Sequence, residues 1–130
     1  AFGCCLLIDC HSMPSLSSPP ERSPGRGPVD VVLGDCYGVS CAEWVVQTAE
    51  DFLESKGYAI QRNIPYAGGF TTRHYGRPSA GIHVMQIEIN RALYMNESTF
   101  ERAGDFTRLC EHMSQLVLFL GRAAGALAGR

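Results

Sequence analysis

The chain has 130 residues, of which 45% are hydrophobic and 18% charged, and its formal net charge is −2. This length accommodates one domain with a hydrophobic core, and the composition excludes an intrinsically disordered chain. The small net charge gives no reason to expect binding to nucleic acid or to an anionic membrane. No apolar run approaches the roughly 20 residues of a membrane-spanning helix.

The hydrophobic pattern predicts four strands. Residues 4–9 form a continuous apolar run, which is typical of a strand covered on both faces. Residues 12–28 are rich in Ser, Pro, Gly and Arg, and we expect a long mobile loop there. The other three strands are expected at residues 29–33, 58–62 and 82–89.

Two helices are expected between and after these strands. Ser40 and Glu43 have the spacing of a capping box, in which each side chain bonds a free backbone amide at the start of a helix. Gly57 is placed to end that helix. A second helix is expected from Phe106 onward, fraying toward Arg130. Strands that alternate with helices predict a layered α/β domain.

The start of the chain raises an expectation about its completeness. There is no initiator Met, and the first expected core strand begins at Gly3. We therefore expect residues 1–130 to be a single partial domain that is truncated at its amino terminus.

The six cysteines do not indicate a disulfide framework. Cys36 and Cys41 lack the spacing of a CxxC pair, Cys110 falls on the apolar face of the second expected helix, and the others lie in or beside the first strand. We predict buried free thiols in a reducing cytoplasm.

Asp9 and His11 lie where the first strand ends, a position at which α/β sheets commonly bind ligands. Because strand side chains alternate, both lie on one face, and the carboxylate can orient the imidazole. On spacing alone, a histidine that only forms hydrogen bonds is favoured over a metal ligand, because one histidine does not define a metal site.

Glu88 lies among apolar residues of the strand expected at 82–89. A buried carboxylate has a raised pKa, which suits a general base, and it is costly unless it is paired. A buried ion pair with Arg91 or Arg73 explains the residue equally well, and both interpretations stay open.

Residues 66–78 combine glycines with aromatic, basic and hydroxyl side chains. The glycines let the backbone approach a ligand closely, and Arg73 can hold a carboxylate through two hydrogen bonds. Thr72 adds a hydroxyl group, and His74 adds a further polar contact. A glycine-rich turn with solvated arginines is the alternative, but the density of these residues favours a binding loop.

The remaining histidines are interpreted as structural. His83 faces away from Glu88 by strand alternation, and His112 lies on the flank of the second expected helix. A Ser-His-Asp arrangement with Ser12 or Ser40 stays open, although no GxSxG motif supports it.

Residues 9–14, 34–38 and 66–95 together resemble the carboxyl-terminal half of the N-formylglutamate amidohydrolases. The most specific part is residues 68–76 followed by residues 86–90. The resemblance implies a mixed sheet flanked by helices, a phosphorylase/hydrolase-like architecture shared with zinc carboxypeptidases and aspartoacylase-like enzymes.

By this resemblance, His11 matches a histidine ligand of a zinc ion, and Glu88 matches the general base. Arg73, His74 and Thr72 would bind a small N-acyl amino acid. The implied reaction is hydrolysis of N-formylglutamate to glutamate and formate, a late step of histidine degradation in the cytoplasm.

The chain departs from the family in one respect. The family's other zinc ligands come from sequence upstream of Gly3, and no His-x-x-Glu motif occurs in this chain. Because catalytic zinc sites use three protein ligands, we expect this chain alone to be inactive and to bind zinc weakly or not at all.

Three other functions stay open. The first is a non-catalytic family member that binds carboxylates. The second is an acylase for another N-acyl amino acid, and the third is a scaffold that self-associates into homo-oligomers through exposed apolar surface.

Overall fold

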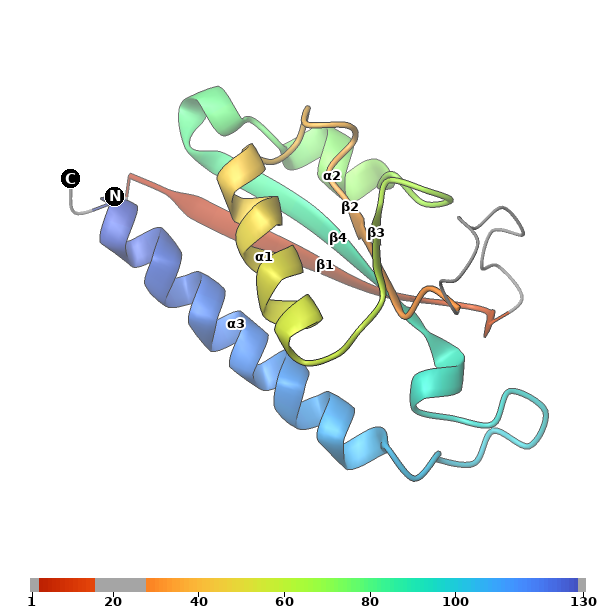
Figure 1. Cartoon of the computed structure of the whole chain (residues 1–130). Helices are drawn as coiled ribbons and strands as arrows, with labels where there is room; N and C mark the ends of the chain where they lie inside the picture. The colour runs from red at the N-terminus through yellow and green to blue at the C-terminus, as the bar shows by residue number, and fades with distance from the viewer. Residues whose placement is uncertain (1–2, 16–27, 129–130) are drawn as a thin grey trace.

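The computed structural model describes residues 3–15 and 28–128. Its four strands are β1 (Cys5–Met13), β2 (Val31–Gly34), β3 (Ile60–Arg62) and β4 (Ile82–Asn90), and they form one sheet in the order β1-β4-β2-β3 (Figure 1). β1 and β4 are parallel, β4 and β2 antiparallel, and β2 and β3 parallel. The expected mixed α/β fold is confirmed.

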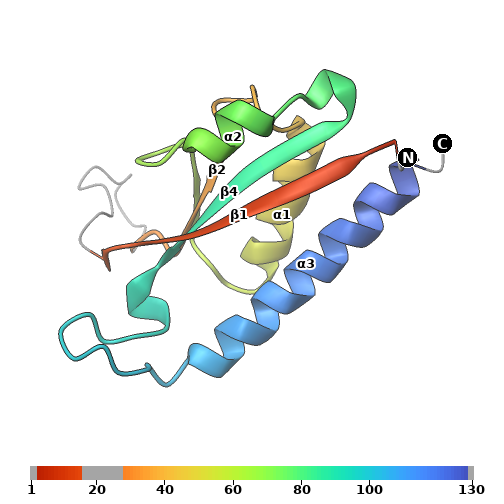
Figure 2. The ribbon, with the colours of Figure 1, turned by 180° about the vertical axis from the view of Figure 1, so that it is seen from behind.

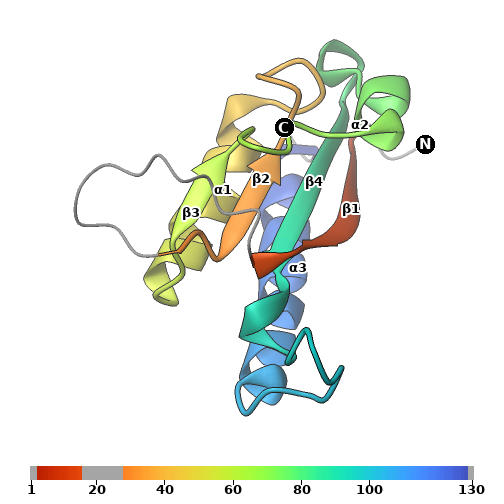
Figure 3. The same cartoon turned by 90° about the vertical axis from the view of Figure 1, so that its right-hand side faces the viewer.

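Helices cover both faces of this sheet. The two long helices, α1 (Glu43–Ser55) and α3 (Phe106–Ala128), contact each other and cover one face. The short helix α2 (Phe70–Tyr75) lies on the opposite face over β4, as Figures 2 and 3 show. The short turns η2 (Pro78–Ala80) and η3 (Arg91–Leu93) flank β4 along the chain.

The main core lies between the sheet and the two long helices. On β4, Met85 and Ile87 enter this core, so Gln86 and Glu88 point to the face that carries α2. α1 contributes residues at helical spacing, which is why the hydrophobic pattern predicted it correctly. The buried members are Val31, Leu33, Cys41, Val45, Val46, Ala49, Leu53, Met85, Ile87, Leu116 and Leu120.

β1 differs from its prediction. It is at the edge of the described sheet, its side chains are mostly half-buried or exposed, and Leu7 is 39% exposed. The expectation of a strand covered on both faces is therefore wrong for this structure. β1 also continues to Met13, so Ser12 and Met13 belong to the strand and not to the expected loop. Most of that loop lies outside the described residues.

The predicted capping box does not form. The Ser40 hydroxyl donates to the Val84 carbonyl at 2.9 Å, and α1 begins only at Glu43. The backbone N–H of Ala42 donates instead to Nδ1 of His83 at 3.2 Å, which gives this histidine the structural role that was predicted. Gly57 adopts a φ of +90° directly after the helix, as expected of a C-terminal glycine.

The cysteines are free, as predicted, but most are not buried. Cys41 is buried, and burial raises the pKa of its thiol to about 12. Cys5, Cys10 and Cys110 are exposed, which corrects the placement of Cys110 on the apolar face of α3.

α3 is helical to Ala128, so the helix extends through the Gly/Ala-rich sequence where fraying was expected. Leu109, Leu116 and Leu120 are its buried apolar side chains. Within the part of the chain that the structure describes, no helix has the length and apolarity needed to cross a bilayer.

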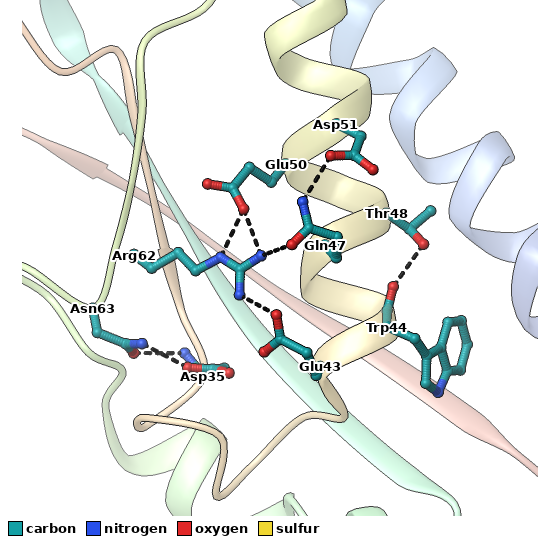
Figure 4. A network of polar contacts seen from close by, with 9 residues as sticks. All are labelled: Asp35, Glu43, Trp44, Gln47, Thr48, Glu50, Asp51, Arg62 and Asn63. Carbon is teal, nitrogen blue, oxygen red and sulfur yellow. Dashed lines mark hydrogen bonds and ion pairs between the residues drawn. The ribbon is translucent and has the colours of Figure 1, made fainter.

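Arg62 joins β3 to α1 through a polar network (Figure 4). Its guanidinium donates to Glu43 Oε1 at 2.6 Å, to Gln47 Oε1 at 2.8 Å and, through Nε, to Glu50 Oε2 at 2.8 Å. The Arg62 and Glu50 side chains are largely buried, at 24% and 20% exposure. Several charge-assisted bonds with reduced solvent screening make this network a stabilising contact.

Replacing Arg62 by Met should lower the free energy of unfolding by about 1–3 kcal/mol, because the network loses its only guanidinium and leaves Glu50 without its cation. Urea unfolding at neutral pH measures this. Arg108→Met is the matched control, since its pair with Asp105 is 64% and 65% exposed and should contribute less than about 1 kcal/mol. Equal losses in the two variants would contradict the stabilising role.

Candidate functional site

Polar side chains occupy the face of β1 and β4 that does not contact α1 and α3. In the parallel register of these strands, Asp9 is opposite Gln86 and His11 is opposite Glu88. Because residues two apart in a strand share a face, the four side chains form one patch. Gln86 and Glu88 are buried, at 4% and 5% exposure, whereas the His11 side chain is 48% exposed.

The imidazole of His11 lies between two carboxylates. Its Nε2 is 3.2 Å from Oδ1 of Asp9, and its Nδ1 is 3.7 Å from Oε1 of Glu88. Gln86 donates from Nε2 to the same Glu88 oxygen at 2.6 Å. The structure therefore confirms that His11 and Glu88 lie together and that Asp9 is placed to orient the imidazole. Their chemical roles remain predictions.

The alternative in which Glu88 forms an ion pair with an arginine is wrong. The carboxylate contacts Gln86 and His11, while Arg91 donates from Nε to the Ser12 hydroxyl at 3.2 Å. Arg73 is exposed on α2. The predicted burial of Glu88 is confirmed, and its pKa is raised by desolvation, against the lowering effects of His11 and the Gln86 hydrogen bond.

The predicted binding loop contains the helix α2 and the turn before it. Thr72 is fully buried, its hydroxyl donates to the Gly69 carbonyl at 2.9 Å, and it accepts from the Cys36 thiol at 3.4 Å. The structure thus gives Thr72 a role in holding the start of α2, and a contact of its hydroxyl with substrate stays a prediction.

Arg73 and His74 are exposed on α2, on the same side of the sheet as Glu88. The His74 ring stacks on Phe70, with ring centroids 4.8 Å apart and an angle of 14° between the planes. Among the described residues, no hydrogen bond or ion pair joins Arg73 or His74 to the His11–Glu88 pair. The structure therefore brings the two groups to one face without linking them directly.

The turn that follows β2 begins with Asp35, which forms a buried polar pair with Asn63 that was not predicted from the sequence. Asn63 accepts from the backbone N–H of Asp35 at 3.0 Å and donates to its carboxylate at 2.7 Å (Figure 4). A Cβ atom on Gly34 would lie 2.8 Å from the Ala67 carbonyl carbon. The turn therefore packs against the segment that leads to α2, and only glycine fits at position 34 without a shift of backbone. Asp35 and Asn63 lie on separate segments of the chain, so no local spacing in the sequence predicts their contact.

Gln86 was also missed as a site residue. It precedes Glu88 by two positions on a buried strand, so the strand period alone places both side chains on one face. A polar residue two positions before Glu88 on a buried strand was therefore the sequence feature from which Gln86 could have been identified.

The described residues do not by themselves fit a catalytic zinc ion. Within residues 3–15 and 28–128, no three His, Cys, Asp or Glu side chains are grouped so that they could hold a metal. His11 is the one histidine of the patch, and each of its ring nitrogens faces a carboxylate. A zinc site with three protein ligands would need further donors besides His11.

The fold and the site define a mixed α/β domain with a buried carboxylate beside a histidine on the sheet. A solved amidohydrolase has the same architecture: the N-formylglutamate amidohydrolase of Ralstonia eutropha JMP134 matches 95% of the chain with a TM-score of 0.79 and 38% identity. The family model of the N-formylglutamate amidohydrolases matches residues 1–95. The chain belongs to this family.

Two curated relatives agree with this assignment. The N-formylglutamate deformylase of Pseudomonas putida is 37% identical over 98 residues, and that of Pseudomonas aeruginosa is 37% identical over 97 residues. These alignments cover 75% and 74% of the chain but only 36% and 35% of the relatives. The chain thus spans about a third of the length of these relatives, and 43% of the solved Ralstonia chain.

The raised pKa of Glu88 predicts how stability depends on pH. Because folding favours the protonated form, the contribution of this group is fully present below its ordinary pKa of 4.5 and is lost as the pH rises through the higher pKa of the folded state. Glu88→Gln, which stays neutral, should therefore gain stability relative to the original chain as the pH rises from 4 to 8. Urea unfolding across this range measures the difference.

The matched control is Glu111→Gln, which replaces an exposed carboxylate on α3. Because this side chain is exposed, the substitution removes no buried charge, and the change with pH should be larger for Glu88→Gln. Equal changes in the two variants would show that burial does not disfavour the charged form of Glu88.

Proposed function

We propose that this chain supplies part of the active site of an enzyme that hydrolyses N-formyl-L-glutamate to glutamate and formate. The family membership and the printed names of the relatives support the substrate. The observation that carries the proposal is the buried Glu88 carboxylate beside the accessible imidazole of His11, on the stretch that matches the family.

In this proposal Glu88 is the general base. It accepts a proton as water attacks the formyl carbon, and the proton is then delivered to the nitrogen when the C–N bond breaks. Glutamate leaves with its amino group, and the formyl group leaves as formate. Burial raises the pKa of Glu88, which improves its ability to accept a proton near neutral pH.

Arg73 is proposed to bind the carboxylates of the substrate, with His74 and Thr72 beside it. Arg73 is exposed, and within residues 3–15 and 28–128 no carboxylate forms an ion pair with it. The planar guanidinium can donate two parallel hydrogen bonds to one carboxylate, which both binds and orients it. The location of α2 on the Glu88 side of the sheet supports this assignment.

We further propose that His11 is one ligand of a zinc ion in the complete active site. The contact of Nε2 with Asp9 supports this, because ligating histidines commonly bond a carboxylate through their other ring nitrogen. Zinc in such enzymes stabilises negative charge that develops on oxygen. The residues that the structure describes offer too few ligands by themselves, so the proposal applies where further donors join His11.

Two substitutions in the complete gene product that contains this sequence test the assignment with N-formylglutamate as substrate. Glu88→Gln should lower kcat by about 10²–10⁴, because the amide cannot accept the proton. Arg73→Ala should mainly raise KM, because it removes a binding contact that ground state and transition state share.

The controls for this pair are Glu111→Gln and Arg108→Ala, which remove exposed charges of α3. Steady-state kinetics of all four variants separates the roles. Full activity of the Glu88→Gln variant would contradict the assignment of Glu88 as the general base.

The 130-residue chain alone should bind zinc weakly and show no turnover, because residues 3–15 and 28–128 do not group three ligands for the ion. Isothermal titration with zinc chloride, together with an assay for released formate, measures both quantities. Tight one-to-one binding with turnover would contradict the proposed need for further ligands. His11→Ala is the control for whatever weak binding is found, and it should reduce that binding.

A further inference from the structure

Gln86 forms the shortest contact to the Glu88 carboxylate. The two side chains share a face of β4, and the amide Nε2 is 2.6 Å from Oε1 of Glu88, closer than the 3.7 Å between that oxygen and His11. In the structure the amide nitrogen faces the carboxylate and donates to it, and the amide oxygen faces away. The contact therefore fixes both ends of the Gln86 side chain.

The other end of the amide is unsatisfied. Oε1 of Gln86 is buried and has no hydrogen-bond partner among the described residues. It faces Gly69, where a Cβ atom would lie 3.5 Å away. A buried acceptor without a partner lowers stability, and an apolar side chain of similar size would avoid this loss.

The location of Gln86 suggests a reason why this buried oxygen is left without a partner. Gly69 is the N-cap residue of α2, the helix that carries Arg73. The Gln86 side chain thus lies between the carboxylate of Glu88 and the start of this helix. Among the described residues, Gln86 is the side chain that donates a hydrogen bond to Glu88, and it does so at Oε1, in a patch that also contains Asp9.

We propose that Gln86 is a positioning residue, which holds the Glu88 carboxylate in one orientation while its own carbonyl, next to the start of α2, stays unpaired. This inference rests on the proposed role of Glu88 as the base. It assigns Gln86 an effect on the chemical step through Glu88, without a contact of its own to the reacting atoms.

A double-mutant cycle in the 130-residue chain tests the contact without any assay of activity. Gln86→Met should lower the urea midpoint in the original chain, because Glu88 loses its donor. In the Glu88→Met background the same substitution should raise the midpoint, because only the unsatisfied amide is removed. Such a reversal of sign is the mark of coupling between the two side chains.

Gln61→Met on β3 is the matched control, because it makes the same change in the same sheet but two strands away from β4. Its effect should be equal in both backgrounds. If Gln86→Met also has the same effect in both backgrounds, Gln86 only fills space and the inference is overturned.

Kinetics of the complete gene product with N-formylglutamate provides the second measurement. Gln86→Met should lower kcat by on the order of tenfold and leave KM within about twofold, because the base is misplaced while substrate binding is retained. If kcat is unchanged in Gln86→Met while Glu88→Gln is inactive, the inference about Gln86 is overturned and the proposed function is not. An active Glu88→Gln would overturn the proposed function, and the double-mutant cycle would still report on the contact.

Discussion

The pairing of β1 with β4 is the constraint on which the candidate site depends. His11 and Glu88 belong to strands that are distant in the sequence, and only their parallel register places them opposite each other. A slip of one residue would turn the side chains of β1 to the other face of the sheet and separate the imidazole from the carboxylate. The hydrogen bonds of this ladder therefore determine the geometry of the patch as directly as the side chains do.

The patch also shows how a polar group is tolerated inside a small domain. β4 directs Met85 and Ile87 into the main core and Glu88 to the opposite face, so one strand serves both packing and the candidate site. Burial opposes the charge on Glu88, and the neighbouring amide and imidazole only partly offset it. Buried ionisable residues that destabilise the fold are commonly found at functional sites.

Patterns within single elements predicted much of this structure. The spacing of Val45, Val46 and Ala49 indicated α1, and the apolar run around Glu88 indicated a buried strand with an unusual acid. Contacts between distant segments were beyond such patterns: the Ser40 hydroxyl bonds Val84 instead of capping a helix. Apolarity likewise could not tell an edge strand from a central one. The meeting of His11 with Glu88 was expected from family resemblance, since spacing cannot reveal strand register.

The order of the strands has a consequence for how the chain folds. β4 lies between β1 and β2 in the sheet, yet it is the last of the four strands along the chain. During synthesis, β1 and β2 therefore have no central strand to join until residues 82–90 have left the ribosome. Pairing over such long sequence separations is slow, and apolar strands that wait for it are prone to aggregate. Recombinant production of this chain should therefore benefit from low temperature, because the hydrophobic attraction between waiting strands weakens on cooling.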